Sequence, residues 1–529
     1  MMGPVLGIDL GTTFSCAAHL AEGRPRVIFN QDGAAMTPSV VGFTSSGESL
    51  VGNPALRQAV TNPRKTLFAV KRLIGRKYAD PVVQEARSRL PYKLLAAPNG
   101  DVLIDAGGPP ITPQEVSALI LGHIKAYAEA YLGQEVRDAV VTVPAHFGEA
   151  QRQATKDAAV IAGLNVVRVI NEPTAASLAF GLSRAANGKA AVFDMGGGTF
   201  DITLLEISGG VFQILATNGD SYLGGEDFDR KIVDWMLEAL KKDQGLDLAD
   251  EPYVLQRIRE AAERAKRELS FSTETEINLP FLAATASGSK HFRKTLSRTL
   301  LEELTRGLVD RAFPLMEKTL QETGLRPSDV ETVILVGGQT RMPLIRSRVT
   351  EFFKRAPAEG VNPDESVALG AAVQSGILEG EFQDIVLLLD VTSQSLGIEI
   401  EKDGYEKIIE KNTTIPTRRT KIFTTVENDQ RLVRIHAVQG EEIRASANVS
   451  LATIDLIGLV PGPAGNAQIE VTFEIDASGL VKVAARDAQT GREQQISVHP
   501  ASGLTKQQVD GLAQKERSKP DRKKAHELT

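Results

Sequence analysis

The chain contains one cysteine, Cys16, among 529 residues, and only seven histidines. One cysteine cannot form a disulfide within the chain or supply a cysteine zinc site, and the histidines show no metal-ligand spacing. Long apolar runs are also missing, since none approaches the roughly 20 residues that span a bilayer. No basic segment with an apolar run behind it opens the sequence, as a secretory signal peptide would require. We therefore expect a cytoplasmic protein without a membrane segment.

A large surplus of one charge sign is missing as well. Lys and Arg number 60 against 67 Asp and Glu, so the net charge is -7 at pH 7. This mildly acidic balance argues against general nucleic-acid binding. Hydrophobic content of 42% and charged content of 24% are ordinary for a globular protein. The chain is too long for a single core, so roughly two to four domains are expected.

Two kinds of sequence pattern divide the chain. Strand-like and helix-like segments alternate over residues 1–381, which predicts an α/β domain, and residues 255–269 predict a long amphipathic helix. Period-two alternation dominates residues 393–503, where two apolar runs around DASG at 476–479 predict a hairpin. This second region predicts an all-β sandwich. Residues 504–529 turn helical and very polar, and we expect residues 515–524 to be frayed or disordered.

One motif occurs twice. Residues 5–13 read VLGIDLGTT and residues 191–199 read AVFDMGGGT, each an apolar strand, an Asp, and then a turn of glycine and threonine. Glycine lets backbone N–H groups approach a phosphate without a Cβ in the way. The Asp makes sense when a divalent cation lies between it and the phosphate. Either turn alone could be structural, but the pair predicts two jaws around one polyphosphate. A Walker A motif is absent, which excludes a P-loop enzyme.

These turns and the segments between them resemble the signature segments of the 70-kDa heat-shock chaperones, most closely the bacterial DnaK type. The likeness runs from residue 3 to about residue 510 and implies an actin-like, two-lobed α/β ATPase domain over 1–381. It also implies an interdomain linker over 382–392, an all-β peptide-binding domain over 393–503 and a helical lid remnant over 504–529. The segments that carry it are Gly7–Thr13, Val143-Pro144, Ile170–Ala176, Asp194–Asp201, Gly224–Asp229, Val336–Pro343 and Asn362–Glu365.

For the ATPase domain, the resemblance implies that ATP or ADP binds with Mg²⁺, and K⁺ is a further expected cation. Mg²⁺ and Lys71 would offset the repulsion between a triphosphate and the carboxylates around it. The implied catalytic residues are Lys71, Glu172, Asp194 and Thr199, and Asp9, Asp194 and Asp201 would position Mg²⁺, mostly through water. The implied nucleotide contacts are Gly11, Thr12, Thr13, Gly196, Gly197, Gly198, Thr199, Gly224, Glu263, Lys266, Arg267, Ser270, Gly337, Gly338, Arg341 and Asp364.

Several of these residues also have plainer interpretations. Lys71 alone could be a solvated surface lysine, and the turn at Val336–Pro343 could be a simple strand-to-helix turn. Glu263, Lys266 and Ser270 have i, i+3 and i+7 spacing and so would share one helix face. That face could equally be a solvated charged surface.

For the second domain, the resemblance implies a molecular chaperone that binds extended apolar segments of unfolded proteins, with an affinity switched by ATP hydrolysis. The expected partners are unfolded polypeptides, a J-domain cochaperone and a GrpE-type nucleotide exchange factor, and the chain is expected to be mostly monomeric. The implied peptide-binding residues are Ile398, Glu401, Phe423, Val426, Val433 and Ile435, and the implied linker and J-domain residues are Arg168, Asn171, Leu388, Leu389 and Asp390.

The chain departs from the family pattern in three places. Glu401 and Val426 stand where the residues that arch over the peptide are often Met and Ala, so we expect a preference for peptides with basic flanks. The long helical lid is expected to be missing beyond its first turns, and fast peptide exchange would follow. His146, Gly148 and Glu149 replace a usual Tyr and two polar residues. This third departure puts the choice of J-domain partner in question but not the ATPase.

Two other functions compete with this one. A small-molecule kinase can share a two-lobed fold, but it would leave the β region and the apolar linker without a role. A scaffold protein with a degenerate nucleotide site is disfavoured because Asp9, Lys71, Glu172, Asp194 and Thr199 are all present.

Overall fold

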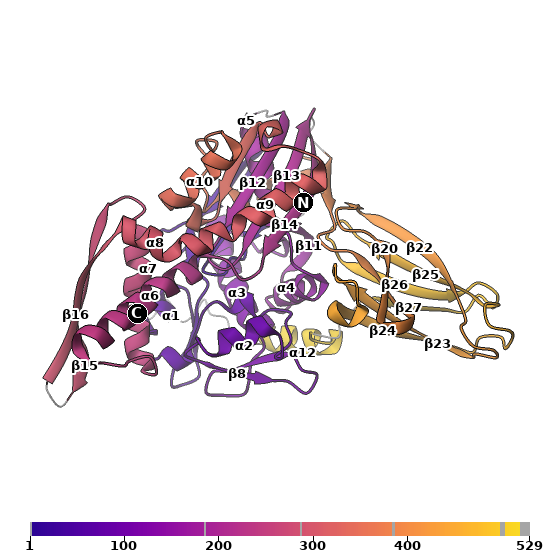
Figure 1. Ribbon diagram of the computed structural model, residues 1–529, viewed down its shortest axis with the longest axis horizontal. Coiled ribbons are helices and arrows are strands. Elements are labelled where there is room, and N and C mark those ends of the chain that lie inside the picture. The colour runs from indigo at the N-terminus through magenta and orange to yellow at the C-terminus, as the bar shows by residue number, and fades with distance from the viewer. Residues whose placement is uncertain (1–2, 185–186, 286–287, 383–386, 498–502, 519–529) are drawn as a thin grey trace.

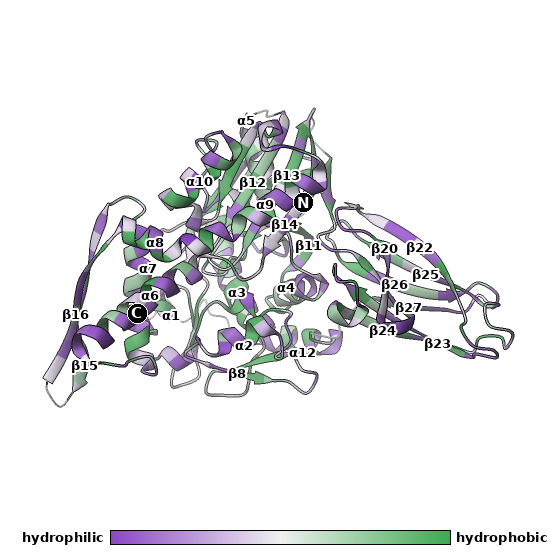
Figure 2. Ribbon diagram, viewed as in Figure 1, coloured by the Kyte–Doolittle hydropathy of each residue, from purple (hydrophilic) through white to green (hydrophobic). Residues whose placement is uncertain are grey.

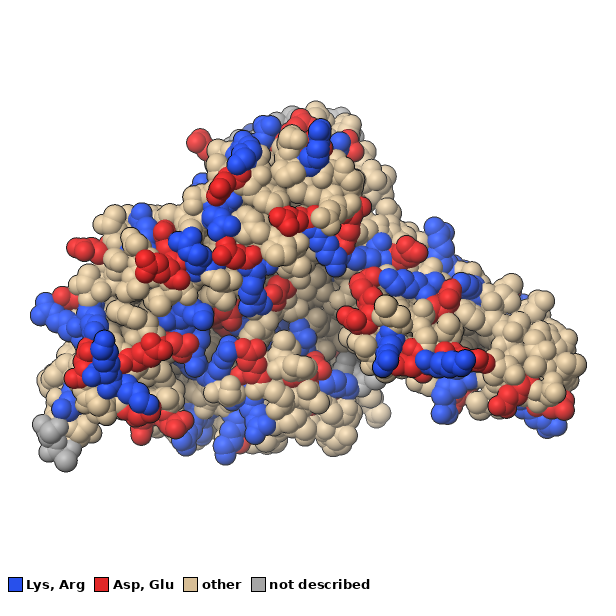
Figure 3. All heavy atoms as spheres, in the orientation of Figure 1, with Lys and Arg blue, Asp and Glu red and all other residues tan. Residues whose placement is uncertain are grey.

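The computed structural model describes residues 3–184, 187–285, 288–382, 387–497 and 503–518. Figure 1 shows two α/β lobes side by side, with a β-rich domain at one end and a long hairpin projecting at the other. Acidic and basic side chains are interspersed over the face in Figure 3, as the small net charge leads one to expect. None of the helices in the described ranges is long and apolar enough to cross a membrane.

The first lobe is built on a mixed six-stranded sheet. Its central strands read as nearly continuous apolar runs because helices cover both faces. In path order the strands are β11 (Asn165–Asn171), β10 (Asp138–Val143), β1 (Val5–Asp9), β2 (Phe14–Ala21) and β3 (Arg24–Ile28), with β4 (Met36–Pro38) paired to β2. The longer helices of this lobe are α3 (Pro113–Leu132), α4 (Glu149–Ile161) and α11 (Ser366–Glu379).

Short elements complete the first lobe, and one of them carries Lys71 into the interlobe cleft. They are β5 (Val41–Phe43), β6 (Ser49–Val51), β7 (Thr66–Leu67), β8 (Lys93–Ala96), β9 (Val102–Asp105), α1 (Asn53–Gln58), α2 (Pro81–Arg87) and the 3₁₀ turns η1 (Pro63–Lys65) and η2 (Val70–Arg72).

The second lobe repeats the design of the first. Each doubled glycine motif joins a strand to its antiparallel neighbour, β1 to β2 in one lobe and β12 to β13 in the other. In path order the sheet holds β17 (Thr332–Val336), β12 (Gly188–Met195), β13 (Phe200–Ser208), β14 (Val211–Asp220), β18 (Leu388–Val391) and β21 (Thr414–Ile415). The other elements are α5 (Glu172–Arg184), α6 (Gly225–Gln244), α7 (Pro252–Glu268), β15 (Glu274–Thr285), β16 (Gly288–Ser297), α8 (Arg298–Asp310), α9 (Ala312–Thr323), the 3₁₀ turns η3 (Pro327–Asp329) and η4 (Gly338–Arg341), and α10 (Pro343–Phe353).

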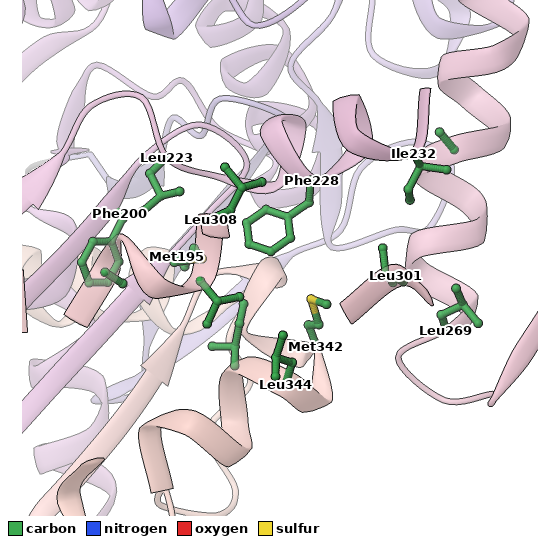
Figure 4. Packing of buried hydrophobic residues seen from close by; sticks show 14 of the residues in the cluster. Met195, Phe200, Leu223, Phe228, Ile232, Leu269, Leu301, Leu308, Met342 and Leu344 are labelled. Atoms are coloured by element: carbon green, nitrogen blue, oxygen red, sulfur yellow. The ribbon is translucent and has the colours of Figure 1, made fainter. Parts of the chain in front are cut away.

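The largest apolar cluster lies in the second lobe, where α6, α7 and α8 meet the sheet. Phe228 is fully buried there, and Figure 4 shows its ring pointing toward Leu308 and Met342. The predicted amphipathic helix is confirmed as α7, which buries alanines on its inner side and exposes charged residues. Figure 2 shows the same segregation, with green strands inside and purple on the outer helices. Burial of this cluster fixes α7 beside the cleft.

The β domain consists of two four-stranded antiparallel sheets around one apolar core. The hairpin predicted around DASG is confirmed, since Ile475 pairs with Val481 across the turn. One sheet holds β20 (Gly404–Ile409), β19 (Leu396–Ile400), β23 (Leu432–Gln439) and β24 (Val449–Ile457), and the other holds β22 (Thr417–Thr424), β25 (Gln468–Ile475), β26 (Val481–Asp487) and β27 (Glu493–Ser497). Two 3₁₀ turns, η5 (Glu401–Asp403) and η6 (Ala445–Ala447), lie in its loops.

The C-terminal helix α12 (Lys506–Arg517) packs on the first lobe rather than on the β domain. Val509 shares an apolar cluster with Ala118 of α3 and Ile161 of α4. The expected fraying from residue 515 is wrong for 515–517, which form the last turn of α12. Residues 519–529 lie outside the described residues.

Candidate functional site

The two glycine turns face each other across the cleft between the lobes. A Cβ on Gly197 would lie 2.0 Å from Thr13 Oγ1, and a Cβ on Gly198 would lie 2.6 Å from Thr12 Oγ1. Only glycine allows the second turn to approach the first this closely. Thr13 Oγ1 is buried and has no hydrogen-bond partner among the described residues, so its hydroxyl is left for a ligand oxygen.

A cavity of about 450 Å³ opens between these jaws. Three residues expected at the site do not line it. Gly198 lies behind Thr12, Gly224 caps α6 against the backbone of Gly197 and Gly198, and Asp201 is buried behind the cleft. The expected residues that do line it are Asp9, Gly11, Thr12, Thr13, Lys71, Glu172, Asp194, Gly196, Gly197, Thr199, Glu263, Lys266, Arg267, Ser270, Gly337, Gly338, Arg341 and Asp364.

Lys71 and Glu172 form a buried ion pair, with 2.5 Å between Nζ and Oε1. Lys71 lies in η2 and Glu172 is the first residue of α5, so the pair joins two distant segments of the chain. The Lys71 ammonium also lies 5.8 Å from the centre of the Phe147 ring. The structure therefore places the expected lysine in the cleft and not on the solvated surface.

Carboxylates crowd the floor of the cleft. Burial and then the charge of Glu172 raise the pKa of Asp9 to about 7. Burial followed by the charges of Glu172 and Asp201 raises the pKa of Asp194 well above its usual value. Burial also raises the pKa of Glu172, against the lowering effect of Lys71. One lysine cannot keep so many buried carboxylates ionised together, so the site favours an added cation.

The charges of the residues at this site fit Mg²⁺. Asp9 and Asp194 line the cavity beside the phosphate turns, and like-charge repulsion between them is what a divalent cation would relieve. In the described part of the chain, no group of three or more His, Cys, Asp or Glu side chains is arranged to hold a metal directly. The fit between Mg²⁺ and this site therefore rests on charge, and Asp9 and Asp194 are the residues that would hold the ion.

The far end of the cavity carries the residues expected around adenosine. Lys266 pairs with Asp229 at 2.9 Å and donates to the carbonyl of Gly225 at 2.8 Å. Ser270 lines the cavity but lies beyond the last residue of α7, so the expectation of one shared helix face is wrong for it. Glu263 and Arg267 remain on α7 and line the same cavity.

The third glycine turn closes the cavity from the second lobe. Gly337 has a φ of 80° and a Cβ there would lie 2.3 Å from the carbonyl oxygen of Met195, so glycine is required. Arg341 pairs with Asp364 at 2.5 Å and donates to Asn362 at 3.1 Å. The two expected residues Arg341 and Asp364 therefore hold each other at the rim.

Sequence reasoning missed Arg72, which ties the two lobes together next to Lys71. Its guanidinium donates to the carbonyl of Gly198 at 3.0 Å and to Asp227 at 2.5 Å. It also lies 4.3 Å from the centre of the Tyr222 ring. The local sequence gives no signal for this role, because all three partners lie more than a hundred residues away along the chain.

The linker joins the sheet of the second lobe as its strand β18. Leu388 and Leu389 pair in parallel with Phe212 and Gln213 of β14. Leu388 is buried and Leu387 is 56% exposed. The rest of the apolar linker, 383–386, lies outside the described residues. A strand that extends an existing sheet edge explains how adjacent leucines can be accommodated here without a core of their own.

Asp390 anchors this strand to the first lobe. Both oxygens of its buried carboxylate accept from Asn171 Nδ2 at 3.0 Å, and Thr174 Oγ1 donates at 3.3 Å. Asn171 is held in turn by Arg152, 2.6 Å from its Oδ1. Arg168 acts on Asp390 through its charge alone, since the described residues show no hydrogen bond between them.

The β domain also contacts both lobes directly, through residues that sequence reasoning did not single out for this role. Gln439 Oε1 accepts from the backbone N–H of Glu149 at 3.0 Å in the first lobe. Lys411 pairs with Glu322 at 2.8 Å and donates to Asn218 at 2.7 Å in the second lobe. The structure therefore shows the β domain docked on both α/β lobes.

Glu149 makes this docking sensitive to pH. Burial raises the pKa of its carboxyl group to about 8, against the lowering effects of a hydrogen bond with the backbone of Val481 in the β domain and of the Arg152 charge. If undocking exposes the group, we expect its pKa to fall back toward the ordinary 4.5, so that over the interval between the two values the docked form holds the proton more tightly. Docking is therefore strongest below pH 4.5 and weakens as the pH rises toward about 8. The equilibrium constant for docking falls by at most tenfold per pH unit.

We expect hydrogen exchange of β18 to speed up several-fold for each pH unit near pH 7, after correction for intrinsic rates. Glu149 lies at the N-terminal end of α4, where the helix dipole favours the ionised carboxylate. The change in exchange rate is therefore expected to stay below tenfold per pH unit. Glu149→Gln mimics the protonated form and should flatten the dependence. Asp390, whose pKa burial also raises, would leave a residual slope of the same sign. A wild-type slope that persists unchanged in Glu149→Gln would contradict this account.

The six residues expected to bind peptide do not form one surface. Ile398 and Ile435 pack into the core of the sandwich, 5% and 3% exposed, so the expectation that they line an open cleft is wrong for this docked form. Phe423 and Val433 pack against that core from outside. Glu401, in η5, and Val426, between β22 and β23, are both exposed.

Comparison with known protein families agrees with these observations. A family model described as Hsp70 protein matches residues 5–528. The match begins at β1 and extends beyond α12, so it includes both lobes, the linker strand and the β domain.

Proposed function

The chain belongs to the Hsp70 family, whose members are ATPases and ATP-dependent chaperones, and from this premise we propose how its two domains work together. ATP is hydrolysed in the cleft between the lobes, and the reaction switches the grip of the β domain on extended apolar peptides. One observation carries the proposal. Glu172 holds Lys71 while the preceding residue, Asn171, holds Asp390 of the linker. A shift at the phosphate end of the cleft must therefore move the linker anchor.

The cleft residues divide the work of hydrolysis. Thr12, Thr13 and Thr199 provide hydroxyls for phosphate oxygens, and Lys71 provides positive charge where negative charge shifts during phosphoryl transfer. Glu172 orients Lys71 and would place the attacking water. When bound, Mg²⁺ supplies neutralisation of the phosphate charge.

The proposed switch has two states, and in one of them the linker and the β domain are docked on the lobes, as the structure shows. Because the linker contact at Asn171 and the cleft contact at Glu172 lie side by side where β11 runs into α5, nucleotide and peptide bias the same equilibrium. Such coupling is reciprocal and typically about 1–3 kcal/mol. A DnaK-type arrangement of partners follows. Peptide binds the β domain, a GrpE-type factor promotes nucleotide release, and K⁺ accompanies Mg²⁺. A J-domain would meet Arg168, which is half-buried, and not Asn171, which the linker covers.

The test is steady-state ATP hydrolysis by the full chain with and without an extended apolar peptide. Peptide should raise turnover several-fold. Phosphoryl transfer to a sugar would instead indicate a kinase, and absence of hydrolysis would indicate a scaffold.

The exposed carboxylate of Glu401 should bias peptide choice. On a peptide array, we expect Lys or Arg flanks to improve binding about twofold to fivefold, because a partly exposed charge pair is worth about 0.2–1 kcal/mol. Glu401→Gln should remove the bias, whereas the matched variant Glu493→Gln, which changes an exposed residue at the start of β27 in the other sheet, should keep it. Equal binding of basic and acidic flanks by the wild-type chain would rule this preference out.

A further inference from the structure

His146 bridges the two lobes behind the nucleotide cleft. It lies in the turn after β10 of the first lobe, and its ring contacts two residues of the second lobe. Nδ1 lies 2.7 Å from Oδ1 of Asp201 on β13, and Nε2 lies 2.8 Å from Oγ of Ser221 after β14. The backbone N–H of His146 donates to the same Asp201 oxygen at 3.2 Å. Three polar contacts from one residue therefore connect the lobes.

The surroundings hold this ring in a single orientation. The His146 side chain is only 11% exposed and that of Asp201 only 1%. Gly219 leaves room for the ring, since a Cβ there would lie 2.4 Å from Nδ1. Phe147 packs edge-on at 6.2 Å between ring centres. The site is thus built around an imidazole.

The polar partners also decide which ring nitrogen carries the proton. A carboxylate oxygen accepts, so Nδ1 is the nitrogen that donates to Asp201, and Nε2 is left to share a hydrogen bond with the Ser221 hydroxyl. Asp201 therefore receives two N–H donors from His146, one from the ring and one from the backbone. Two donors fix where its carboxylate points.

The direction of that carboxylate matters because of its neighbour. Asp201 is the cross-strand partner of Asp194, which lines the cleft. Partner side chains on antiparallel strands lie on the same face of the sheet, about 4.5–5.5 Å apart at Cβ. The bonds to His146 hold the Asp201 carboxylate toward the first lobe. Without them its distance from Asp194 would no longer be fixed, and its charge acts directly on the pKa of Asp194.

Resting on the function proposed above, we propose that His146 is a positioning residue for ATP hydrolysis, which fixes the Asp201 carboxylate relative to Asp194 while the lobes are together. It does not line the cavity and so does not touch the nucleotide. On this proposal, the departure at position 146 bears on the ATPase centre as well as on the choice of partner.

Two isosteric variants separate the two ring nitrogens. The amide of His146→Asn places a donor near Nδ1, and that of His146→Gln places one near Nε2. We expect His146→Phe and His146→Gln to lower kcat about tenfold, the loss typical of a charge-assisted hydrogen bond. His146→Asn should stay within about threefold of the wild type. KM for ATP should change less than twofold in all three variants, because the cleft lining is intact.

The outcomes are distinguishable in the full chain. Ser221→Ala, which keeps the Asp201 contact, should lower kcat less than threefold. A loss of kcat in Ser221→Ala or His146→Asn as large as in His146→Phe would overturn the proposal. Loss of any polar contact between the lobes would then explain the lower kcat, whether or not Asp201 is held. Unchanged kcat in His146→Phe would overturn it as well. Binding of a fluorescent ATP analogue reports an intact fold in each variant. Failure of the wild-type chain to hydrolyse ATP would instead refute the proposed function.

Discussion

Replacing Lys71 by methionine is expected to lower ATP turnover about 10²–10³-fold. Methionine keeps much of the length and volume of the side chain but removes the ammonium group 2.5 Å from Glu172. Loss of one preorganised group that stabilises transition-state charge typically costs about 3–4 kcal/mol of barrier. The removal also leaves the buried Glu172 carboxylate without its cation, which raises its pKa further. Single-turnover hydrolysis of pre-bound ATP measures the chemical step directly.

A matched control separates this effect from general damage. Lys125 also pairs with a glutamate, Glu129, at 3.0 Å, but it does so along α3 in the first lobe, away from the cleft lining. Lys125→Met should leave turnover unchanged, because such helix pairs contribute only about 0.3–0.5 kcal/mol to stability. If Lys71→Met hydrolyses ATP within tenfold of the wild type, the assigned role of Lys71 is wrong.

The local patterns predicted the framework well because each depends on neighbouring residues. The strand-Asp-glycine-threonine motif occurs in both lobes, and its two copies do face each other through Gly197 and Thr13. The long amphipathic helix and the hairpin around DASG are present within a few residues of their expected bounds. Periodicity and turn chemistry are short-range properties, so one sequence can reveal them.

Such local patterns could not predict polar contacts between residues that lie far apart in the sequence. Lys71 and Glu172 are separated by 101 positions, and only the family resemblance suggested that they work together. Neither pattern nor resemblance indicated the contact of His146 with Asp201 or that of Lys411 with Glu322. Polar contacts between lobes depend on how whole domains pack, and the sequence around one charged residue does not indicate which distant residue it will pair with.

Burial was also harder to foresee than secondary structure. Ile398 and Ile435 alternate correctly for strands, but alternation alone does not say whether the apolar face meets a peptide or the opposite sheet. The structure puts them in the core. In the same way, the polar composition of residues 506–517 concealed a narrow apolar stripe with Val509 that packs against α3 and α4.

The linker anchor should be the most sensitive point of the coupling. Asp390→Ala removes the acceptor of four hydrogen bonds and leaves the Asn171 amide, the Thr174 hydroxyl and the Val391 backbone N–H without it. An unsatisfied buried donor costs about 1–3 kcal/mol, which is comparable with the whole coupling energy expected between the domains. We therefore expect peptide stimulation of turnover to disappear, while hydrolysis itself persists because Asp390 does not line the cleft.

Two measurements on this variant test the coupling separately. The ratio of turnover with and without peptide should fall to about one, and hydrogen exchange should show that β18 has lost its protection. Asp455→Ala is a matched control, because it removes an exposed carboxylate that pairs with Arg434 on the surface of the β domain, and it should retain full stimulation. Retention of stimulation by Asp390→Ala would mean that the direct contacts Gln439–Glu149 and Lys411–Glu322 carry the signal instead. Loss of stimulation with β18 still protected would place the coupling outside the linker strand, so the two readouts together assign the path.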